Sequence, residues 1–274
     1  MDGTMIGDTT YMTKCISTVE FIRNSYEANK LTNISAPPNL LTYADIYDKK
    51  LIRPNLKELL HGIKEHFPTA ELFVYSHGVK DYVNDLVSII EKETDFTFNR
   101  PLFSREDSVV TENGYQYKSI LVRFPTIVKV LLSKYPALKE EHAKEEVLAS
   151  RIIFIDDYDF VWDRKDKWLK CPGYKYTSII DISKYLPIDN TRDPLVKSYM
   201  TKQGGLFIEP DGVTIDVRNM LYHIHMANTY GTVIEQNKQA ETDTFCKDLL
   251  RKLKTYKRLV KPFTEEHIKE LLAP

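Results

Sequence analysis

Cysteine is scarce in this 274-residue sequence, and the few present are scattered. The three residues, Cys15, Cys171 and Cys246, are far apart and form no Cys-x-x-Cys pair. An odd, dispersed set argues against a disulfide scaffold and against a zinc site, and it favours a reducing compartment. Glycine is also scarce, with 10 residues, but that shortage alone identifies no class of protein.

Long apolar runs and an excess of charge are missing as well. No apolar run approaches the roughly 20 residues that a membrane-spanning helix needs, and the first residues lack the charged-then-apolar pattern of a signal peptide. The formal net charge is -1, so bulk charge gives no reason to expect a nucleic-acid partner. We therefore expect no membrane association and an intracellular location, cytoplasmic or nuclear. The sequence leaves the oligomeric state open.

The sequence does contain an alternation of helical and strand-like segments. Hydrophobic residues make up 42% and charged residues 28%, which allows a sizeable core. Continuous apolar runs at residues 71–75 and 151–155 predict two buried parallel strands. Apolar residues at helical spacing predict helices over residues 55–66, 82–90 and 124–135. This alternation indicates an α/β fold with a parallel sheet flanked by helices.

The sequence pattern weakens in the C-terminal part of the chain. Residues 178–182 could form one more strand, and residues 204–212 are typical of a turn, a short strand and a turn. Residues 245–260 predict a basic amphipathic helix, whose charges are more readily explained by solvation than by binding. We predict a first domain over residues 1–168 and an α+β extension of unknown role over residues 169–274.

Polar side chains follow the predicted strands. Asp-Gly-Thr at residues 2–4, Ser76 with His77, and the pair Asp156 and Asp157 fall at strand ends. Open parallel sheets bind ligands at the carboxyl ends of their strands. Each motif alone has an ordinary explanation as a turn, a helix cap or a local packing residue. Their order and shared context make the combination a candidate site.

The combination matches the needs of a phosphatase with a phosphoaspartyl intermediate. Such an enzyme needs an Asp nucleophile and, two residues later, an Asp that acts as acid and base. A hydroxyl and a lysine offset the phosphoryl charge, and further carboxylates hold Mg²⁺. The sequence supplies all but the nucleophile: Asp2, Ser76, a lysine, Asp156 and Asp157.

These residues resemble a known family. The chain is similar to the phosphatases that act on the RNA polymerase II C-terminal domain, the NLI-interacting-factor-like family of the haloacid dehalogenase superfamily. The similarity runs from Asp2 to Trp162 and includes an Arg-Pro pair before a helix, an apolar strand that ends in Ser, and an apolar strand that ends in Asp-Asp. The matching segments are residues 53–60, 71–76, 80–82, 100–106, 113–120 and 153–162.

The resemblance implies a fold, an activity and a metal. The fold would be a Rossmann-like parallel sheet flanked by helices, and the activity Mg²⁺-dependent hydrolysis of phosphoserine or phosphothreonine in a phosphoprotein. Asp2 would be the general acid and base, and its backbone carbonyl would help to bind Mg²⁺. Asp157 would ligate the metal, with Asp156 beside it as ligand or orienting residue.

The resemblance also implies a phosphate-binding set. Ser76, His77 and Lys118 would contact the phosphoryl group, and Ser76 stands where the family has Thr. Lys139 competes with Lys118 for the role, because it lies nearer to Asp156 along the chain. We prefer Lys118 because the residues around it match the family.

The nucleophile of the Asp-x-Asp-Gly-Thr signature would fall directly before Met1, together with the first central strand of the sheet. We expect the natural protein to extend upstream, and we expect no turnover from the chain as given. One alternative is a phosphatase-like interaction protein without turnover. Another is a phosphatase for a metabolite or a polynucleotide end. Similar sequences occur in cells and in large DNA viruses, so the origin stays open.

Overall fold

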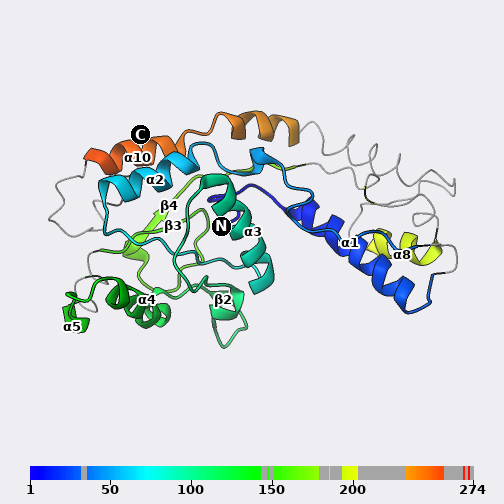
Figure 1. The fold of residues 1–274 in the computed structure, drawn as a ribbon, viewed down its shortest axis with the longest axis horizontal. Helices are drawn as coiled ribbons and strands as arrows, with labels where there is room; N and C mark the ends of the chain where they lie inside the picture. Colours follow the sequence, from blue (N-terminus) through cyan, green and yellow to red (C-terminus); the bar gives the residue numbers. More distant parts are fainter. Residues whose placement is uncertain are drawn as a thin grey trace. The chain divides into compact units, whose positions relative to one another are not determined.

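The structure is a computed structural model that describes residues 1–31, 36–142, 147, 151–178, 185, 193–202, 233–255, 268 and 271. Figure 1 shows the arrangement of its helices and strands. In chain order these are α1 (Thr10–Glu27), η1 (Lys49–Leu51), α2 (Leu56–His66), α3 (Lys80–Thr94), η2 (Arg105–Asp107), β1 (Val109–Val110), β2 (Gln116–Tyr117), α4 (Ile120–Lys134), α5 (Glu140–His142), β3 (Phe154–Asp156), η4 (Lys165–Lys167), β4 (Trp168–Lys170), α8 (Pro194–Lys202) and α10 (Phe245–Thr255).

The chain packs as two compact units, and each is assembled from separated stretches. The first unit comprises Met1–Gly7, Ile52–Tyr174 and Thr242–Pro274, and the second comprises Asp8–Leu51 and Lys175–Glu241. These units follow packing in space, so they do not test where a domain ends along the chain. The boundary after residue 168 stays a prediction.

The helices predicted for the first unit are present. Helices α2, α3 and α4 cover the three predicted helical stretches, and α10 covers the described part of the predicted basic helix. Helix α10 packs on α2 (Figure 1). A Cβ on Gly62 of α2 would lie 2.6 Å from Cδ1 of Leu250, so glycine at this position allows the two helices to approach closely.

The predicted strand at residues 151–155 is shorter and lies slightly later, as β3. It pairs in parallel with β4, so that Asp156 lies opposite Lys170. Its residues Phe154 and Ile155 are only half-buried, whereas the continuous apolar run predicted burial on both faces. The second sheet is the antiparallel pair β1–β2. The described residues thus form a mixed α/β structure with two-stranded sheets, and they do not show the full Rossmann-like parallel sheet that was predicted.

Two further extended segments lie in parallel pairs without forming regular strands. The backbone of Phe103 donates to the carbonyl of Val74 and accepts from Ser76, both at 2.9 Å, so the predicted strand at residues 71–75 is an extended segment. Lys118 is aligned in the same way with Val161. These short parallel pairings bring the polar residues that follow them into one region.

The second unit contains a helix that the sequence pattern did not predict. Helix α1 buries a face that includes Cys15, Thr18 and Ser25, so its apolar stripe is weak. It contacts α8, and the ring of Phe21 stacks on Tyr199 with centroids 3.8 Å apart. Most of the strand predicted over residues 178–182, and the turns predicted over residues 204–212, lie outside the described residues. Among the described helices, none is both long and apolar enough to cross a membrane.

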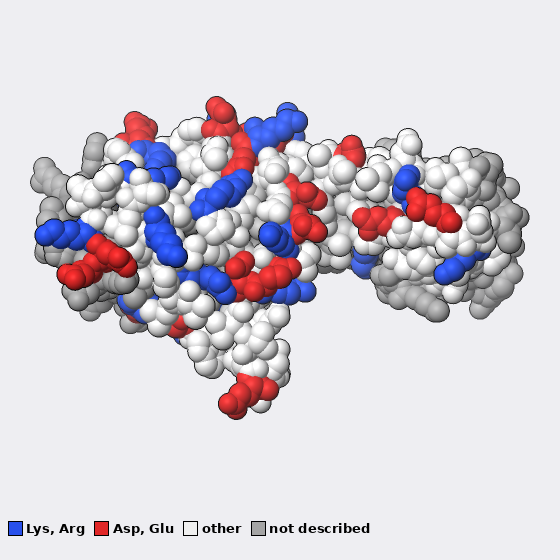
Figure 2. All heavy atoms as spheres, turned by 60° about the horizontal axis from the view of Figure 1, so that its bottom comes forward, with Lys and Arg blue, Asp and Glu red and all other residues white. Residues whose placement is uncertain are grey.

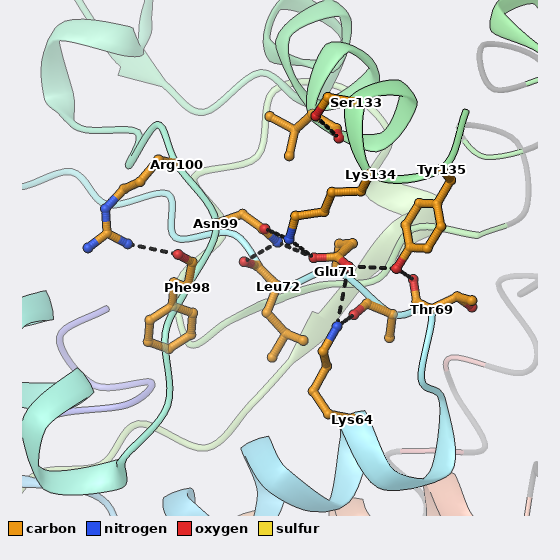
Figure 3. A network of polar contacts seen from close by, with 12 residues as sticks. Lys64, Thr69, Glu71, Leu72, Phe98, Asn99, Arg100, Ser133, Lys134 and Tyr135 are labelled. Atoms are coloured by element: carbon orange, nitrogen blue, oxygen red, sulfur yellow. Dashed lines mark hydrogen bonds and ion pairs between the residues drawn. The ribbon is translucent and has the colours of Figure 1, made fainter. Parts of the chain in front are cut away.

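A polar network around Glu71 ties the ends of two helices to the first extended segment (Figure 3). Its carboxylate accepts hydrogen bonds from Lys64 at the end of α2 and from Lys134 and Tyr135 at the end of α4. The side-chain amide of Asn99 donates to the same carboxylate at 2.8 Å. Burial acts to raise the pKa of Glu71, but these donors outweigh it and lower the pKa to about 2.

Replacing Glu71 by glutamine is expected to remove an acid-sensitive part of the stability. A carboxyl whose pKa is lower in the folded chain stabilises it above the unfolded pKa, and the gain is lost as the pH falls toward the folded value. For Glu71 this window runs from about pH 4.5 down to about pH 2. Since the side chain is only 7% exposed, the loss is roughly 3 kcal/mol. Urea unfolding at pH 7 and pH 2.5 measures it.

The matched control is Glu112→Gln, because Glu112 is exposed in the β1–β2 turn. We expect this variant to keep the acid dependence of the parent protein. An equal pH dependence in Glu71→Gln and the parent would contradict the role of the network.

Candidate active site

A buried ion pair forms the centre of the site. Lys118 Nζ donates to Asp156 Oδ2 at 2.5 Å, and the two side chains are only 3% and 5% exposed. The Lys118 backbone donates to the carbonyl of Phe160 at 2.8 Å and accepts from Trp162 at 2.9 Å. Burial acts to raise the pKa of Asp156, but the charge and hydrogen bond of Lys118, together with the nearby chain terminus and Asp157, outweigh it and hold that pKa below its usual range. Asp156 is therefore ionised at neutral pH.

The pairing of β3 with β4 fixes the position of Asp156. Its carbonyl accepts from the backbone of Cys171 at 3.0 Å and from the indole Nε1 of Trp168 at 3.1 Å. The strand therefore ends at Asp156, and the carboxylate of this last residue is held against Lys118.

Asp157 is half-buried beside this pair. Burial, followed by the charge of Asp156, raises the pKa of Asp157 above its usual range. The hydroxyl of Thr4 donates to Asp157 Oδ1 at 3.2 Å. Gly3 has φ 71°, and a Cβ there would lie 2.2 Å from Asp157 Oδ2. The Asp-Gly-Thr turn therefore encloses Asp157, and only glycine allows this approach.

The first residues of the chain fold back on themselves at the same place. The Met1 carbonyl accepts from the backbones of Thr4, Met5 and Ile6 at 2.9–3.3 Å. Burial lowers the pKa of the Met1 amino group and Lys118 lowers it further, while the nearby aspartates act to raise it. The backbone nitrogen of Met1 thus lies within the field of the ion pair.

Asp2 leaves this cluster and points toward helix α3. Its carboxylate accepts a short hydrogen bond from the hydroxyl of Tyr82, and the residue is exposed. No pattern in the sequence indicated this contact with Tyr82. The Tyr82 hydroxyl therefore orients the Asp2 carboxylate. A carboxylate that exchanges a proton with a ligand needs such a fixed orientation.

Ser76 and His77 lie at the end of the first extended segment. The Ser76 side chain is buried, and its Oγ accepts from the Gly78 backbone at 3.0 Å. The His77 ring packs edge-on against Phe160, with centroids 4.6 Å apart, and its buried Nε2 has no hydrogen-bond partner. Burial, with the charge of Lys118, lowers the pKa of His77 to about 4. At neutral pH His77 is uncharged, so it offers a phosphate no ionic contact.

Of the two lysines considered for phosphate contact, the structure places Lys118 in the cluster. Lys139 is exposed between α4 and α5. Among the described residues, no hydrogen bond or ion pair joins Lys139 to Asp156 or Asp157. Proximity along the chain was therefore a poor guide, because the pairing of Lys118 with Val161 brings the more distant lysine to Asp156.

Arg53 also belongs to this site, although the sequence pattern marked it only as part of an Arg-Pro pair. Its Nη1 donates to the carbonyls of Gly3 and Thr4 at 3.4 and 3.1 Å. Its Nε and Nη2 donate to the two carboxylate oxygens of Asp243 at 3.0 and 2.8 Å. The Arg-Pro pair was the only sequence signal for Arg53, and nothing in the pattern singled out Asp243.

The two adjacent carboxylates fit a hard cation in their chemistry. In the described part of the chain, no three His, Cys, Asp or Glu side chains gather into a metal-binding group, so the Asp2 side chain is not joined to Asp156 and Asp157. Mg²⁺ commonly takes one or two protein carboxylates and completes its shell with water and phosphate oxygens. Burial and then the charge of Asp156 raise the pKa of Asp157, and a divalent cation would offset the repulsion between the two carboxylates.

Comparison with known proteins gives one match. A model of the NLI interacting factor-like phosphatase family matches residues 31–193, a stretch that includes Arg53, Ser76, Lys118 and the Asp156–Asp157 pair and begins after Asp2. No curated protein and no solved structure matches. Because the family model covers more than half of the chain, this protein belongs to the NLI-interacting-factor-like phosphatases, a haloacid-dehalogenase-like family.

Proposed function

We propose that this protein is a Mg²⁺-dependent phosphatase that hydrolyses phosphoserine or phosphothreonine in proteins. One observation carries the proposal: the Asp-Gly-Thr turn, Lys118 and the Asp156–Asp157 pair meet in one place, although they come from three distant parts of the sequence. Family membership supports phosphatase chemistry, and this convergence supports the assignment of residues to it.

In this proposal the chain's own groups bind the phosphoryl group and move one proton. Lys118 and the Ser76 hydroxyl contact phosphoryl oxygens and offset the charge that develops on them. Asp2 donates a proton to the leaving serine oxygen as the phosphorus–oxygen ester bond breaks, and it later takes a proton from the attacking water. A phosphoaspartyl route needs a nucleophilic Asp two positions before the acid–base residue, and the Met1 nitrogen, next to that position, lies within the field of Lys118 and the aspartates.

Asp156 and Asp157 would hold Mg²⁺. The metal supplies charge stabilisation to phosphoryl oxygens when it is bound. Asp157 is the main ligand in this assignment, because Asp156 already pairs with Lys118. The Thr4 hydroxyl donates to the Asp157 carboxylate and so orients it next to the Asp-Gly-Thr turn.

A row of exposed rings beside Lys118 favours a polypeptide substrate over a small metabolite. Tyr158, Phe160 and Trp162 are 63%, 41% and 56% exposed, and they occupy the segment that is hydrogen-bonded to Lys118. Tyr158 stacks on Phe160 with ring centroids 5.6 Å apart, and the ring centroids of Tyr117 and Trp162 are 5.0 Å apart. Exposed aromatic rings next to a site provide contact area for a chain on either side of the phosphorylated residue.

The charges near these rings speak against a polynucleotide substrate. The β1–β2 hairpin at residues 109–117 and the segment at residues 158–163 contain no Lys or Arg. Lys118, Arg164 and Lys165 directly follow these segments, but each is paired with an aspartate. Nucleic-acid affinity depends on basic side chains that neutralise backbone phosphates. On the face shown in Figure 2, basic and acidic side chains are interspersed and form no continuous basic stripe.

A substrate panel tests the proposal. The protein at its natural full length is assayed with Mg²⁺ on a phosphoserine peptide, a sugar phosphate and a 5′-phosphorylated DNA end. We expect hydrolysis of the peptide with kcat/KM at least tenfold higher than for the other two substrates. Binding of the phosphopeptide without turnover would identify an interaction protein, and preference for the sugar or the DNA end would replace the proposed substrate class.

Trp162→Ala is expected to weaken peptide binding without slowing the chemical step. Removing an exposed ring that would touch the substrate only beside its phosphorylated residue should raise KM roughly fivefold and leave kcat unchanged, because that contact is the same in the ground state and the transition state. Leu40→Ala is the matched control, since Leu40 is an exposed apolar side chain in the other compact unit. Equal kinetics for Trp162→Ala and the parent protein would contradict the docking role of the rings.

A further inference from the structure

We propose that Asp243 is a positioning residue of the active site, acting through Arg53 on the Asp-Gly-Thr turn. Asp243 lies just before α10, beyond the stretch that the family model matches. The inference rests on the proposed phosphatase function and extends it, because it makes part of the C-terminal region necessary for the site.

The Arg53 guanidinium connects two segments that are far apart along the chain. The Arg53 side chain is fully buried, and Asp243 is 14% exposed. Two guanidinium nitrogens meet the Asp243 carboxylate in a bidentate pair, and the third donates to the carbonyls of Gly3 and Thr4. The backbone of Arg53 also donates to the Met5 carbonyl at 3.0 Å. One residue therefore holds the turn from its side chain and from its backbone.

The position of Asp243 follows from the packing of α10. Asp243 Oδ1 accepts from the Phe245 backbone at 3.0 Å, at the beginning of the helix. The Phe245 ring lies under the guanidinium, with 4.4 Å from the Arg53 carbon Cζ to the ring centroid. Since α10 packs on α2, and α2 begins three residues after Arg53, the same helix pair fixes both partners.

The chemistry of the pair explains why Asp243 is needed for the turn. A buried guanidinium requires a compensating charge, and its planar fork suits a carboxylate on one edge and carbonyls on another. Without the Asp243 charge, the Arg53 guanidinium has a lower free energy when it turns toward water or another acceptor. The Gly3 and Thr4 carbonyls then lose their donor, and the Thr4 hydroxyl no longer holds Asp157 in place.

Asp243→Asn in the full-length protein tests the inference. We expect kcat for a phosphoserine peptide to fall at least tenfold with KM within twofold of the parent, because the turn carries the acid–base residue and the rings carry peptide binding. Asp243→Glu should have a higher kcat than Asp243→Asn, because it keeps the charge. Arg53→Lys should be as slow as Asp243→Asn, since a lysine cannot make the bidentate contact. Asp248→Asn is the control, because Asp248 lies on α10 and pairs with exposed Arg251.

Amide hydrogen exchange supplies a readout that does not depend on turnover. In Asp243→Asn, exchange at the amides of Thr4, Met5 and Ile6 should rise at least tenfold, while the amides of α3 stay protected. If Asp243→Asn does not fold, Asp243→Glu carries the same comparison. Unchanged exchange and unchanged kcat would overturn the inference.

An equal rise in exchange over α3 would also overturn the inference, because Asp243 would then only stabilise the fold. If the parent protein has no activity on any substrate, the proposed function fails. The exchange result would still decide whether Asp243 positions the turn.

Discussion

Gly3→Ala is expected to abolish Mg²⁺-dependent phosphatase activity and to lower the free energy of unfolding by about 2–5 kcal/mol. Two causes add together. Gly3 has φ 71°, a conformation that costs a residue with a side chain about 1–2 kcal/mol. The new Cβ would also lie 2.2 Å from Oδ2 and 2.7 Å from Cγ of Asp157. Because Asp157 cannot keep its position, its contact with Thr4 is lost as well.

Gly114→Ala separates these two causes. Gly114 has φ 78°, but a Cβ there would meet no atom within 4 Å. This control therefore incurs the backbone cost alone, about 1–2 kcal/mol, and should keep full activity. Urea unfolding and phosphopeptide hydrolysis measure both variants. Equal stability losses and equal activities in the two variants would contradict the close approach of Gly3 to Asp157.

Lys118→Met is expected to lower the free energy of unfolding by about 3–5 kcal/mol and to remove phosphate binding. Methionine keeps the length and apolar volume of the side chain but leaves the Asp156 charge buried without its cation. The pKa of Asp156 should then rise, because burial acts to raise it and the Lys118 charge no longer opposes that effect. Urea unfolding measures the stability loss, and NMR titration of the carboxyl follows the pKa.

Lys165→Met is the matched control for Lys118→Met. Lys165 pairs with Asp159 at 2.9 Å, but both side chains are exposed, so this pair contributes at most about 1 kcal/mol. The double variant Lys118→Met with Asp156→Asn should recover part of the lost stability, since it no longer buries a charge. Similar small losses in the two lysine variants would show that the Lys118 pair is not buried in solution.

The site was predictable from the sequence where each residue follows a local pattern. Apolar runs ending in Ser76 and in Asp156 indicated strand ends, and the structure places both residues at the ends of paired, extended backbone. The residues around Lys118 favoured it over Lys139, and a parallel pairing with Val161 carries it to Asp156. The roles of these residues in catalysis stay predictions.

Contacts made only by tertiary packing could not be predicted. Arg53 meets Asp243 across 190 positions of the chain, and no periodic pattern relates such distant residues. The contact between Tyr82 and Asp2 arises in the same way. Helix α1 escaped prediction because polar and small side chains interrupt its buried face. The predicted parallel sheet rested on helix–strand alternation and on the family resemblance. Alternation indicates the class of fold but not how many strands pair.

Hydrolysis of a phosphoserine peptide by the full-length protein and by Asp157→Asn, each with and without Mg²⁺, tests the central claim most directly. Asparagine keeps the shape of the side chain and its contact with Thr4 but removes the charge that would hold the metal. We predict Mg²⁺-dependent turnover by the parent protein and a fall of at least 100-fold in kcat for Asp157→Asn. Undiminished, metal-dependent turnover by Asp157→Asn would contradict the account.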